Sequence, residues 1–314
     1  MPYPEPPTDD PSLLRRGAVV GPWQVGDLLG EGATSRVYLV SRSGVQAALK
    51  VLKIRSPGQA ARLEREARLL REVRHPNIVA SYETIDVDGL LGLVMEYIPG
   101  PTLADYLRRR RMSIEEATLF GSQLIQGIAA AHRAGLVHRD LKPANVLVDD
   151  RTASLTLKIT DFGLARALGD DATAGRTPTV GMLGTPQYLA PEQLKNASSA
   201  DARADLFSLG AILYEMVVGQ PAFDGDLLAV LNASAVGSFR RPSEVAPGIP
   251  GPIETAIVSA LEPDRRFRVP DADTLLGLWS GSATSWDMPA GFPSLEISVA
   301  PAAPTPLIPE VAAA

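Results

Sequence analysis

The chain has 314 residues, of which 45% are hydrophobic, and its formal net charge is −6 with a pI near 5.2. This length favours about two domains, and the apolar content suffices for a packed core, which excludes a chain that is disordered throughout. The acidic balance argues against nucleic acid as the main partner. The absence of cysteine excludes disulfides, thiolate catalysis and cysteine-based zinc sites.

The two ends differ in composition from the rest of the chain. Residues 1–16 are rich in proline and acidic side chains, and residues 281–314 are rich in proline, alanine and serine, so we expect both segments to be disordered. The start lacks the apolar core and basic flank of a secretory signal. The apolar stretch Leu209–Val218 is interrupted by Glu215 and is too short for a membrane span. We therefore expect a cytoplasmic protein without a membrane segment.

Residues 23–40 alternate apolar and polar side chains around a glycine turn, which predicts a hairpin of two strands. Gly30 and Gly32 permit a tight turn whose backbone N–H groups can approach phosphates, with Val37 as an apolar surface beneath a base. A hairpin with two nearby glycines is also a common plain turn, and Ser35 stands where the usual phosphate-binding pattern has a third glycine. Both interpretations stay open at this point.

A third strand is predicted at residues 47–52, and a helix is predicted from the capping residue Ser56 to about Val73. The helical spacing places Glu66 on the apolar face of this helix. A carboxylate on a buried face needs a cation, and Lys50 on the preceding strand is the natural candidate. The spacing alone also allows Glu66 to lie at the solvated edge of that face.

The strongest chemical signal consists of two short motifs, His138-Arg139-Asp140-Leu141-Lys142-Pro143-Ala144-Asn145 and Asp161-Phe162-Gly163. Apolar runs flank the first motif, and the alternating residues 155–159 predict a strand that returns the chain towards it. Asp140 and Asp161, with Asn145, then provide oxygen ligands for Mg²⁺ and a carboxylate that can accept a hydroxyl proton. This set predicts phosphoryl transfer from a nucleotide, against the plainer interpretation of ordinary turn-forming residues.

With these motifs in this order, residues 21–276 resemble the eukaryotic-type protein kinase family, and most closely its bacterial serine/threonine members. The resemblance implies an α+β, two-lobed fold. The N-terminal lobe at 17–96 would hold a small five-stranded antiparallel β-sheet and one helix, and the C-terminal lobe at 97–280 would be mostly α-helical. ATP would bind between the lobes together with Mg²⁺, or with Mn²⁺ in its place.

The resemblance also implies a role for each residue singled out above. Asp140 would be the catalytic base, with Lys142 steadying the transferred phosphate. Asn145 and Asp161 would be the metal ligands. Lys50 would hold the α- and β-phosphates and pair with Glu66. The other implied nucleotide contacts come from the glycine loop, the pocket walls and the hinge between the lobes, namely Gly30, Glu31, Gly32, Val37, Ala48, Met95, Glu96, Ile98 and Leu147.

Further resemblances concern internal anchors and the acceptor. Glu192, at the end of a stretch that resembles an activation segment, is implied to pair with Arg266, and Asp205 is implied to anchor the backbone of the catalytic loop. Lys142 followed by Pro143 resembles the serine/threonine type and not the tyrosine type. We therefore expect protein substrates with serine or threonine acceptors.

Control by phosphorylation is suggested by Arg139, the residue directly before the base. An arginine there can bind a phosphothreonine bidentately and so order the segment that follows Asp161. Thr177 and Thr179 are the candidate phosphorylation sites, and autophosphorylation in trans would require self-association. A plain polar loop is the alternative interpretation of this stretch.

Ser81 occupies a position where the family usually has an apolar residue that stacks with Leu70, His138 and Phe162, so we expect a weakened active conformation. Three functions therefore remain: an active serine/threonine protein kinase, a catalytically silent kinase-like scaffold, and a small-molecule phosphotransferase of related fold. The complete catalytic set disfavours the scaffold. The segment that ends at Glu192 resembles parts that dock protein substrates, which disfavours a small-molecule acceptor.

Overall fold

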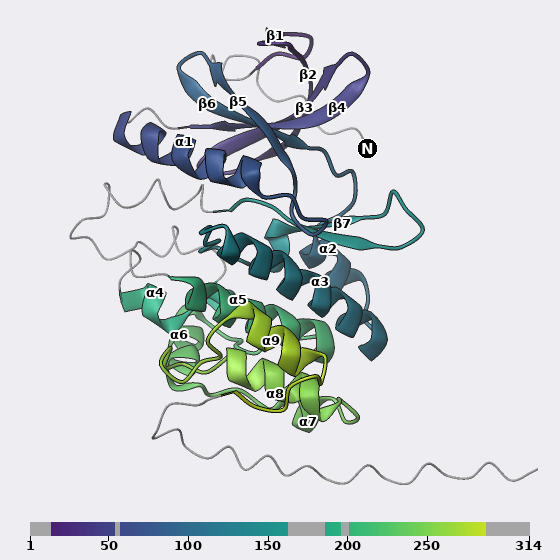
Figure 1. Cartoon of the computed structure of the whole chain (residues 1–314), viewed down its shortest axis with the longest axis vertical. Coiled ribbons are helices and arrows are strands. Elements are labelled where there is room, and N and C mark those ends of the chain that lie inside the picture. The colour runs from purple at the N-terminus through teal and green to yellow at the C-terminus, as the bar shows by residue number, and fades with distance from the viewer. Residues whose placement is uncertain (1–13, 54–56, 163–185, 196–200, 287–314) are drawn as a thin grey trace, which may run out of the picture.

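The computed structural model describes residues 14–53, 57–162, 186–195 and 201–286. Within these ranges the chain forms two lobes, one with an antiparallel sheet and helix α1 and the other mostly helical (Figure 1). The predicted two-lobed α+β architecture is thus confirmed. None of the helices in the described ranges is both long enough and apolar enough to cross a bilayer.

The elements follow in chain order. The strands are β1 (Val19–Val20), β2 (Trp23–Glu31), β3 (Ser35–Arg42), β4 (Val45–Leu52), β5 (Ser81–Val87), β6 (Leu90–Glu96), β7 (Val146–Asp149) and β8 (Thr156–Ile159). The α-helices are α1 (Pro57–Glu72), α2 (Leu103–Arg109), α3 (Ile114–Arg133), α4 (Pro191–Lys195), α5 (Ala202–Val218), α6 (Leu227–Val236), α7 (Pro242–Val245), α8 (Gly251–Ala260) and α9 (Ala272–Trp279). Two short 3₁₀ helices are η1 (Pro143–Asn145) and η3 (Pro186–Tyr188).

The described part of the N-terminal lobe contains one six-stranded antiparallel sheet, in the order β1-β2-β3-β4-β6-β5. The prediction of five strands was wrong by one. The additional strand is β1, whose two residues Val19 and Val20 pair with Gln24 and Trp23. A strand of two residues shows no alternation of apolar and polar side chains, so its sequence carries no period that could predict it.

Strand β4 is buried on both faces from Ala47 to Leu52, because its alternate side chains enter different cores. Leu49 and Val51 pack inside the sheet with Trp23, whereas Leu52 packs towards α1. Lys50 shares the face of Leu52, and this alternation directs its side chain between the sheet and α1. The sheet thus fixes the direction of a buried cation.

Helix α1 covers this face of the sheet, beside strands β5 and β6 (Figure 1). Proline at its first position has the φ angle that a helix needs and no N–H to leave unbonded. The helical spacing predicts an apolar face of Leu63, Ala67, Leu70 and Val73, and all four side chains are buried. The predicted helix and its orientation are confirmed, and the orientation turns Glu66 inward.

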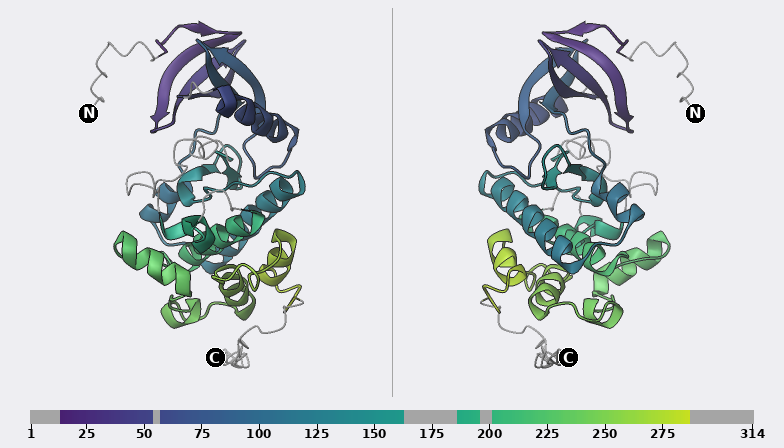
Figure 2. Two further views of the ribbon diagram at one scale, coloured as in Figure 1. Left: turned by 90° about the vertical axis from the view of Figure 1, so that its left-hand side faces the viewer. Right: turned by 90° about the vertical axis from the view of Figure 1, so that its right-hand side faces the viewer.

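Helix α5 forms the centre of the helical lobe, packed by α3 and α8 (Figure 2). Nearly all of its side chains are buried, as expected for a helix that is hydrophobic on all sides. Asp201 caps its first turn, and Gly219 ends it in the left-handed conformation at φ 80°, which glycine adopts without strain. Asp205 lies in the first turn and faces the catalytic loop.

A buried ion pair ties the end of the predicted activation segment to the helical lobe. Glu192 accepts two hydrogen bonds from Arg268, at 2.7 and 3.0 Å, and the Arg268 side chain is 0% exposed. The prediction that Glu192 pairs with Arg266 is wrong, since Arg266 is exposed and pairs with Asp264. The turn that begins at Asp264 directs Arg268, four residues later, into the core beside Phe207.

Candidate active site

The catalytic loop is held by the side chain of Asp205. Its two oxygens accept hydrogen bonds from the backbone N–H groups of His138 and Arg139, both at 2.7 Å. His132 Nε2 lies 2.8 Å from the same carboxylate, and His138 Nε2 lies 2.8 Å from the carbonyl oxygen of Thr160. The implied anchoring role of Asp205 thus has a direct geometric basis.

Two residues of the loops have positive φ without being glycine. Arg139 and Asp161 both have φ 65°, a conformation that costs about 1–3 kcal/mol for such residues. The Asp205 bonds hold the first of these backbones in place. Strain of this kind concentrates where side chains are positioned for chemistry.

Asp140 is the acidic residue of the catalytic loop, His138–Asn145, and its side chain is 39% exposed. Lys142 Nζ lies 2.8 Å from Asp140 Oδ2. The amide nitrogen of Asn145 donates to the Asp140 carbonyl oxygen at 2.8 Å and to its carboxylate at 3.2 Å. With its nitrogen engaged in this way, the amide group of Asn145 offers its oxygen to another partner.

The second motif reaches this loop through the β7–β8 hairpin. Val146 pairs with Ile159, and the backbone N–H of Thr160 donates to the Asn145 carbonyl oxygen at 3.0 Å. The predicted hairpin is confirmed, and it places Asp161 next to Asn145 as expected. Burial alone would raise the pKa of Asp161, but Lys50 Nζ at 2.7 Å outweighs this effect and lowers that pKa below its usual value.

The donor set suits a nucleotide-bound divalent ion. Asp161 and Asn145 supply oxygen atoms, which hard cations such as Mg²⁺ prefer, and Mg²⁺ usually takes its other ligands from water and substrate phosphates. Among the described residues no group of three or more histidine, aspartate or glutamate side chains could hold a metal alone. The residues therefore fit an ion that arrives with a phosphate ligand.

Lys50 and Glu66 have different partners from the pair that the resemblance implied. The Lys50 side chain is 6% exposed and contacts Asp161, while a Glu66 carboxylate oxygen lies 3.5 Å from Nη1 of Arg139. Among the ion pairs between described residues, none joins Lys50 to Glu66. The inward direction of Glu66 is confirmed, but the spacing along a helix cannot choose between two cations that face it.

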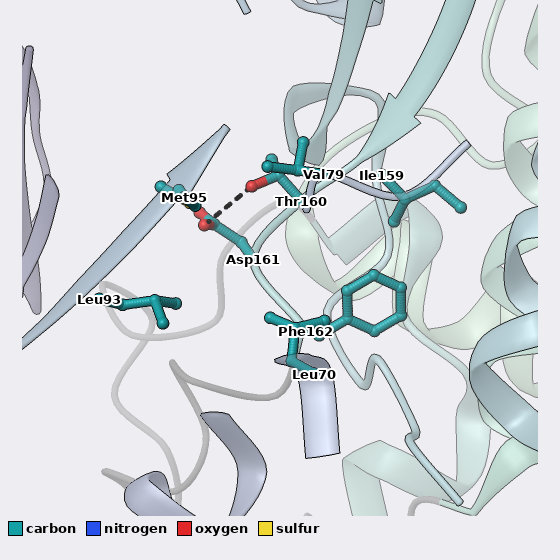
Figure 3. A pocket seen from close by; sticks show the side chains of 8 residues that line it. All are labelled: Leu70, Val79, Leu93, Met95, Ile159, Thr160, Asp161 and Phe162. Atoms are coloured by element: carbon teal, nitrogen blue, oxygen red, sulfur yellow. Dashed lines mark hydrogen bonds between the residues drawn. The ribbon is translucent and has the colours of Figure 1, made fainter. Parts of the chain in front are cut away.

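A small cavity is lined in part by Met95, one of the implied nucleotide contacts (Figure 3). Its lining combines β6, α1 and the second motif, with the residues Leu70, Val79, Leu93, Met95, Ile159, Thr160, Asp161 and Phe162. The rings of His138 and Phe162 stack with centroids 4.7 Å apart. Ser81 pairs with Met95 across β5 and β6 and is fully buried, and its hydroxyl has no hydrogen-bond partner among the described residues.

Replacing Ser81 by alanine is expected to raise the free energy of unfolding by about 1 kcal/mol, because a buried hydroxyl without a partner costs more than a methyl group. Ser208→Ala is the matched control, since the buried Ser208 hydroxyl donates to the Tyr188 carbonyl oxygen at 2.7 Å and its loss should destabilise. Urea unfolding of both variants measures the difference. A Ser81→Ala variant that loses as much stability as the control would contradict this account.

The walls predicted for the adenine pocket come together between the lobes. Ala48, Met95 and Ile98 form one apolar cluster, against which Val37 and Leu147 pack. The glycine loop lies at the end of β2, where the N–H of Gly32 donates to the Ser35 carbonyl oxygen at 2.9 Å. Glu31 pairs with Arg36 and Lys53, and Gly30 opposes Val37 across the hairpin.

The structure also brings forward residues that the sequence did not single out. His132 contacts Asp205, and Gln193 donates to the Arg139 carbonyl oxygen at 3.0 Å. The chain has 3 histidines, and this scarcity was the one signal that could have pointed to His132. The predicted phosphorylation sites Thr177 and Thr179 lie outside the described residues.

Comparison with known proteins agrees with this geometry. Residues 23–247 match the model of the protein kinase domain family. The chain is 38% identical over 266 residues to a probable serine/threonine-protein kinase, SCO3848, of Streptomyces coelicolor, covering 81% of this chain and 39% of that protein. It is 34% identical over 259 residues to the serine/threonine-protein kinase PknB of Mycobacterium tuberculosis, covering 78% and 41%. The chain thus spans about two fifths of the length of these relatives.

Solved structures show the same architecture. A structure of Rad53 residues 1–466 in complex with AMP-PNP superposes with a TM-score of 0.67 at 25% identity, over 82% of this chain and 65% of that one. The PknI kinase domain of Mycobacterium tuberculosis has a TM-score of 0.66 at 22% identity, over 86% and 100%, which supports the fold alone. The family match, the relatives and the anchored catalytic loop lead to one conclusion: this chain belongs to the protein kinase domain family.

Proposed function

We propose that this protein is a serine/threonine protein kinase that transfers the γ-phosphate of ATP to hydroxyl groups of proteins. The observation that carries the proposal is the arrangement of Asp140, Asn145 and Asp161 on two adjoining rigid loops, with Lys142 bonded to the first acid. Phosphoryl transfer depends mainly on positioning and charge stabilisation, which favours side chains held in this way. The names of the bacterial relatives support serine or threonine as the acceptor.

Each residue of the site has a defined task in this proposal. Asp140 accepts the proton of the acceptor hydroxyl, and its exposed carboxylate can be reached from solvent. Lys142 stabilises negative charge beside that carboxylate. Asn145 and Asp161 would hold Mg²⁺, or Mn²⁺ in its place. When bound, the ion neutralises charge on the phosphates and orients them.

The nucleotide would lie over the apolar cluster of Ala48, Met95 and Leu147, with the adenine edge at the main chain of Glu96 and Ile98. We propose that Lys50 then contacts the phosphates and pairs with Glu66, since both side chains enter the space between α1 and the second motif. The Lys50–Asp161 and Arg139–Glu66 pairs of the structure would then be replaced by a pair between Lys50 and Glu66. Cytoplasmic location and self-association for autophosphorylation in trans stay predictions.

Replacing both Thr177 and Thr179 by alanine is expected to lower the transfer rate to an added protein, because Arg139 would lose its phosphate partner. Initial rates of the double variant are compared with those of the wild type after preincubation with ATP. Thr173→Ala, in the same stretch, is the control and should retain more activity than the double variant. Equal rates for wild type and the double variant would remove the proposed switch.

The function is tested by incubating the full chain with labelled ATP and Mg²⁺ and two sets of acceptors, proteins and small hydroxyl metabolites. The expected result is label on serine and threonine residues of protein. Label on metabolites alone would support the small-molecule phosphotransferase instead. No label on any acceptor, with the nucleotide still bound, would support the silent scaffold.

A further inference from the structure

Two cations of the β7–β8 hairpin reach from the helical lobe to the predicted hinge between the lobes, Met95-Glu96-Tyr97-Ile98. Glu96 is the last residue of β6, and its two carboxylate oxygens contact Nη2 of Arg151 at 2.8 Å and Nζ of Lys158 at 2.9 Å. Arg151 lies in the turn of the hairpin, and Lys158 lies on β8. The side chains of Glu96 and Lys158 are 16% and 13% exposed, so their contact is largely shielded from solvent, whereas the Arg151 side chain is 44% exposed.

Arg151 is itself held in place before it meets the hinge. Asp149, at the end of β7, accepts hydrogen bonds from Nε and Nη2 of Arg151 at 2.8 and 2.6 Å. Such a bidentate pair fixes the plane of a guanidinium group. The remaining nitrogen, Nη1, lies 3.4 Å from the carbonyl oxygen of Tyr97. One arginine thus contacts two successive residues of the hinge from a fixed position.

The hinge backbone is also fixed on either side of these contacts. The Glu96 N–H donates to the Ala80 carbonyl oxygen at 2.8 Å. After the hinge, the N–H of Val148 on β7 donates to the Pro101 carbonyl oxygen at 2.8 Å. A Cβ atom at Gly100 would lie 1.8 Å from the carbonyl oxygen of Val148, so only glycine permits this approach. The hairpin and the hinge are therefore one packed unit.

The charges in this unit are matched. Burial alone would raise the pKa of Glu96, but the hydrogen bonds from Lys158 and Arg151 outweigh it and hold that pKa below its usual value. Two cations on one carboxylate leave a net positive charge that Asp149 balances through Arg151. Groups that are mutually satisfied in this way have one preferred geometry, which limits how far the hinge can move.

We infer that Arg151 and Lys158 are positioning residues for the adenine base, acting through Glu96 on the hinge backbone. The inference rests on the proposed function, in which main-chain groups at Glu96 and Ile98 bind that base. A hinge that is already rigid binds its ligand with less loss of conformational freedom. The β7–β8 hairpin would thus set nucleotide affinity without touching the nucleotide.

The test is Arg151→Gln in the full chain, with KM for ATP, kcat, and the dissociation constant of adenosine as readouts. We expect KM for ATP and the adenosine constant to rise together by about threefold to tenfold, as loss of a partly buried charged contact implies, while kcat changes less than about twofold. Arg151→Lys should be intermediate, because lysine cannot bond bidentately to Asp149. Glu96→Gln should raise both constants at least as much as Arg151→Gln, because it removes the partner of Lys158 as well as that of Arg151.

Arg133→Gln is the matched control, because Arg133 forms an exposed ion pair with Asp273 at 2.9 Å on the helical lobe. Lys158→Gln removes the other cation from the Glu96 carboxylate. If Arg151→Gln does not fold, the adenosine affinity of Lys158→Gln tests the inference. Unchanged adenosine affinity in Arg151→Gln, a fall in kcat alone, or equal effects in the Arg133 control would overturn the inference.

Adenosine binding and phosphate transfer by the wild type distinguish a failure of the proposed function from a failure of the positioning role of Arg151 and Lys158. A wild-type chain that binds adenosine but transfers no phosphate would contradict the proposed function, and the adenosine affinities of the variants would still decide the inference. A wild-type chain that binds no adenosine would overturn the positioning role as well.

Discussion

Asp140→Asn is expected to lower the rate of phosphoryl transfer to protein by about 10²- to 10⁴-fold while the chain stays folded. Asparagine has the same shape but cannot accept the proton of the acceptor hydroxyl. Its oxygen can still meet Lys142, and the backbone bonds from Asp205 to the loop are unaffected. Initial rates with labelled ATP measure the loss, and thermal unfolding verifies the fold.

The matched control for this experiment is Asp273→Asn, which removes an exposed carboxylate of α9 that pairs with Arg133. Its transfer rate should equal that of the wild type. A rate for Asp140→Asn within a few-fold of the wild type would show that a different group receives the proton, and the role assigned to Asp140 would be wrong.

Arg268→Met is expected to lower the free energy of unfolding by about 3–5 kcal/mol, because it removes the buried cation that faces Glu192. The guanidinium group also donates to carbonyl oxygens of Arg203 and Glu262, which would lose a charged donor. Urea unfolding monitored by tryptophan fluorescence measures the change. Arg266→Met should unfold like the wild type, since Arg266 is exposed.

This pair of variants also separates the two candidate partners of Glu192. Equal losses of stability in Arg266→Met and Arg268→Met, or a larger loss in the first, would contradict the buried pair seen in the structure. The sequence alone could not choose between them, because Arg265, Arg266 and Arg268 follow one another in a turn that has no helical or strand period.

The elements with a clear period were predictable from sequence. The alternation at residues 155–159 was sufficient to place Asp161 beside Asn145, since a short hairpin leaves few other geometries. The apolar spacing of α1 likewise predicted its buried face, but it left two directions open for Glu66, and the structure has this side chain turned inward and 17% exposed. These predictions rest on local rules that tertiary contacts did not override.

What could not be predicted depends on contacts between segments far apart in the chain. Whether Lys50 pairs with Glu66 or Asp161 depends on the position of α1 relative to the second motif, which no local pattern fixes. The contact between Arg151 and Glu96 joins residues 55 positions apart, and each of them alone looks like an ordinary surface charge. The family resemblance supplied roles for residues, and it did not supply this geometry.

Asp161 and Asn145 are proposed to hold a divalent ion together with the phosphates of ATP. The most direct measurement is the affinity for a non-hydrolysable ATP analogue with and without Mg²⁺, in the wild type and in Asp161→Asn. Mg²⁺ is expected to tighten binding of the analogue to the wild type and to have little effect on its binding to the variant. Equal Mg²⁺ dependence in both proteins would contradict it.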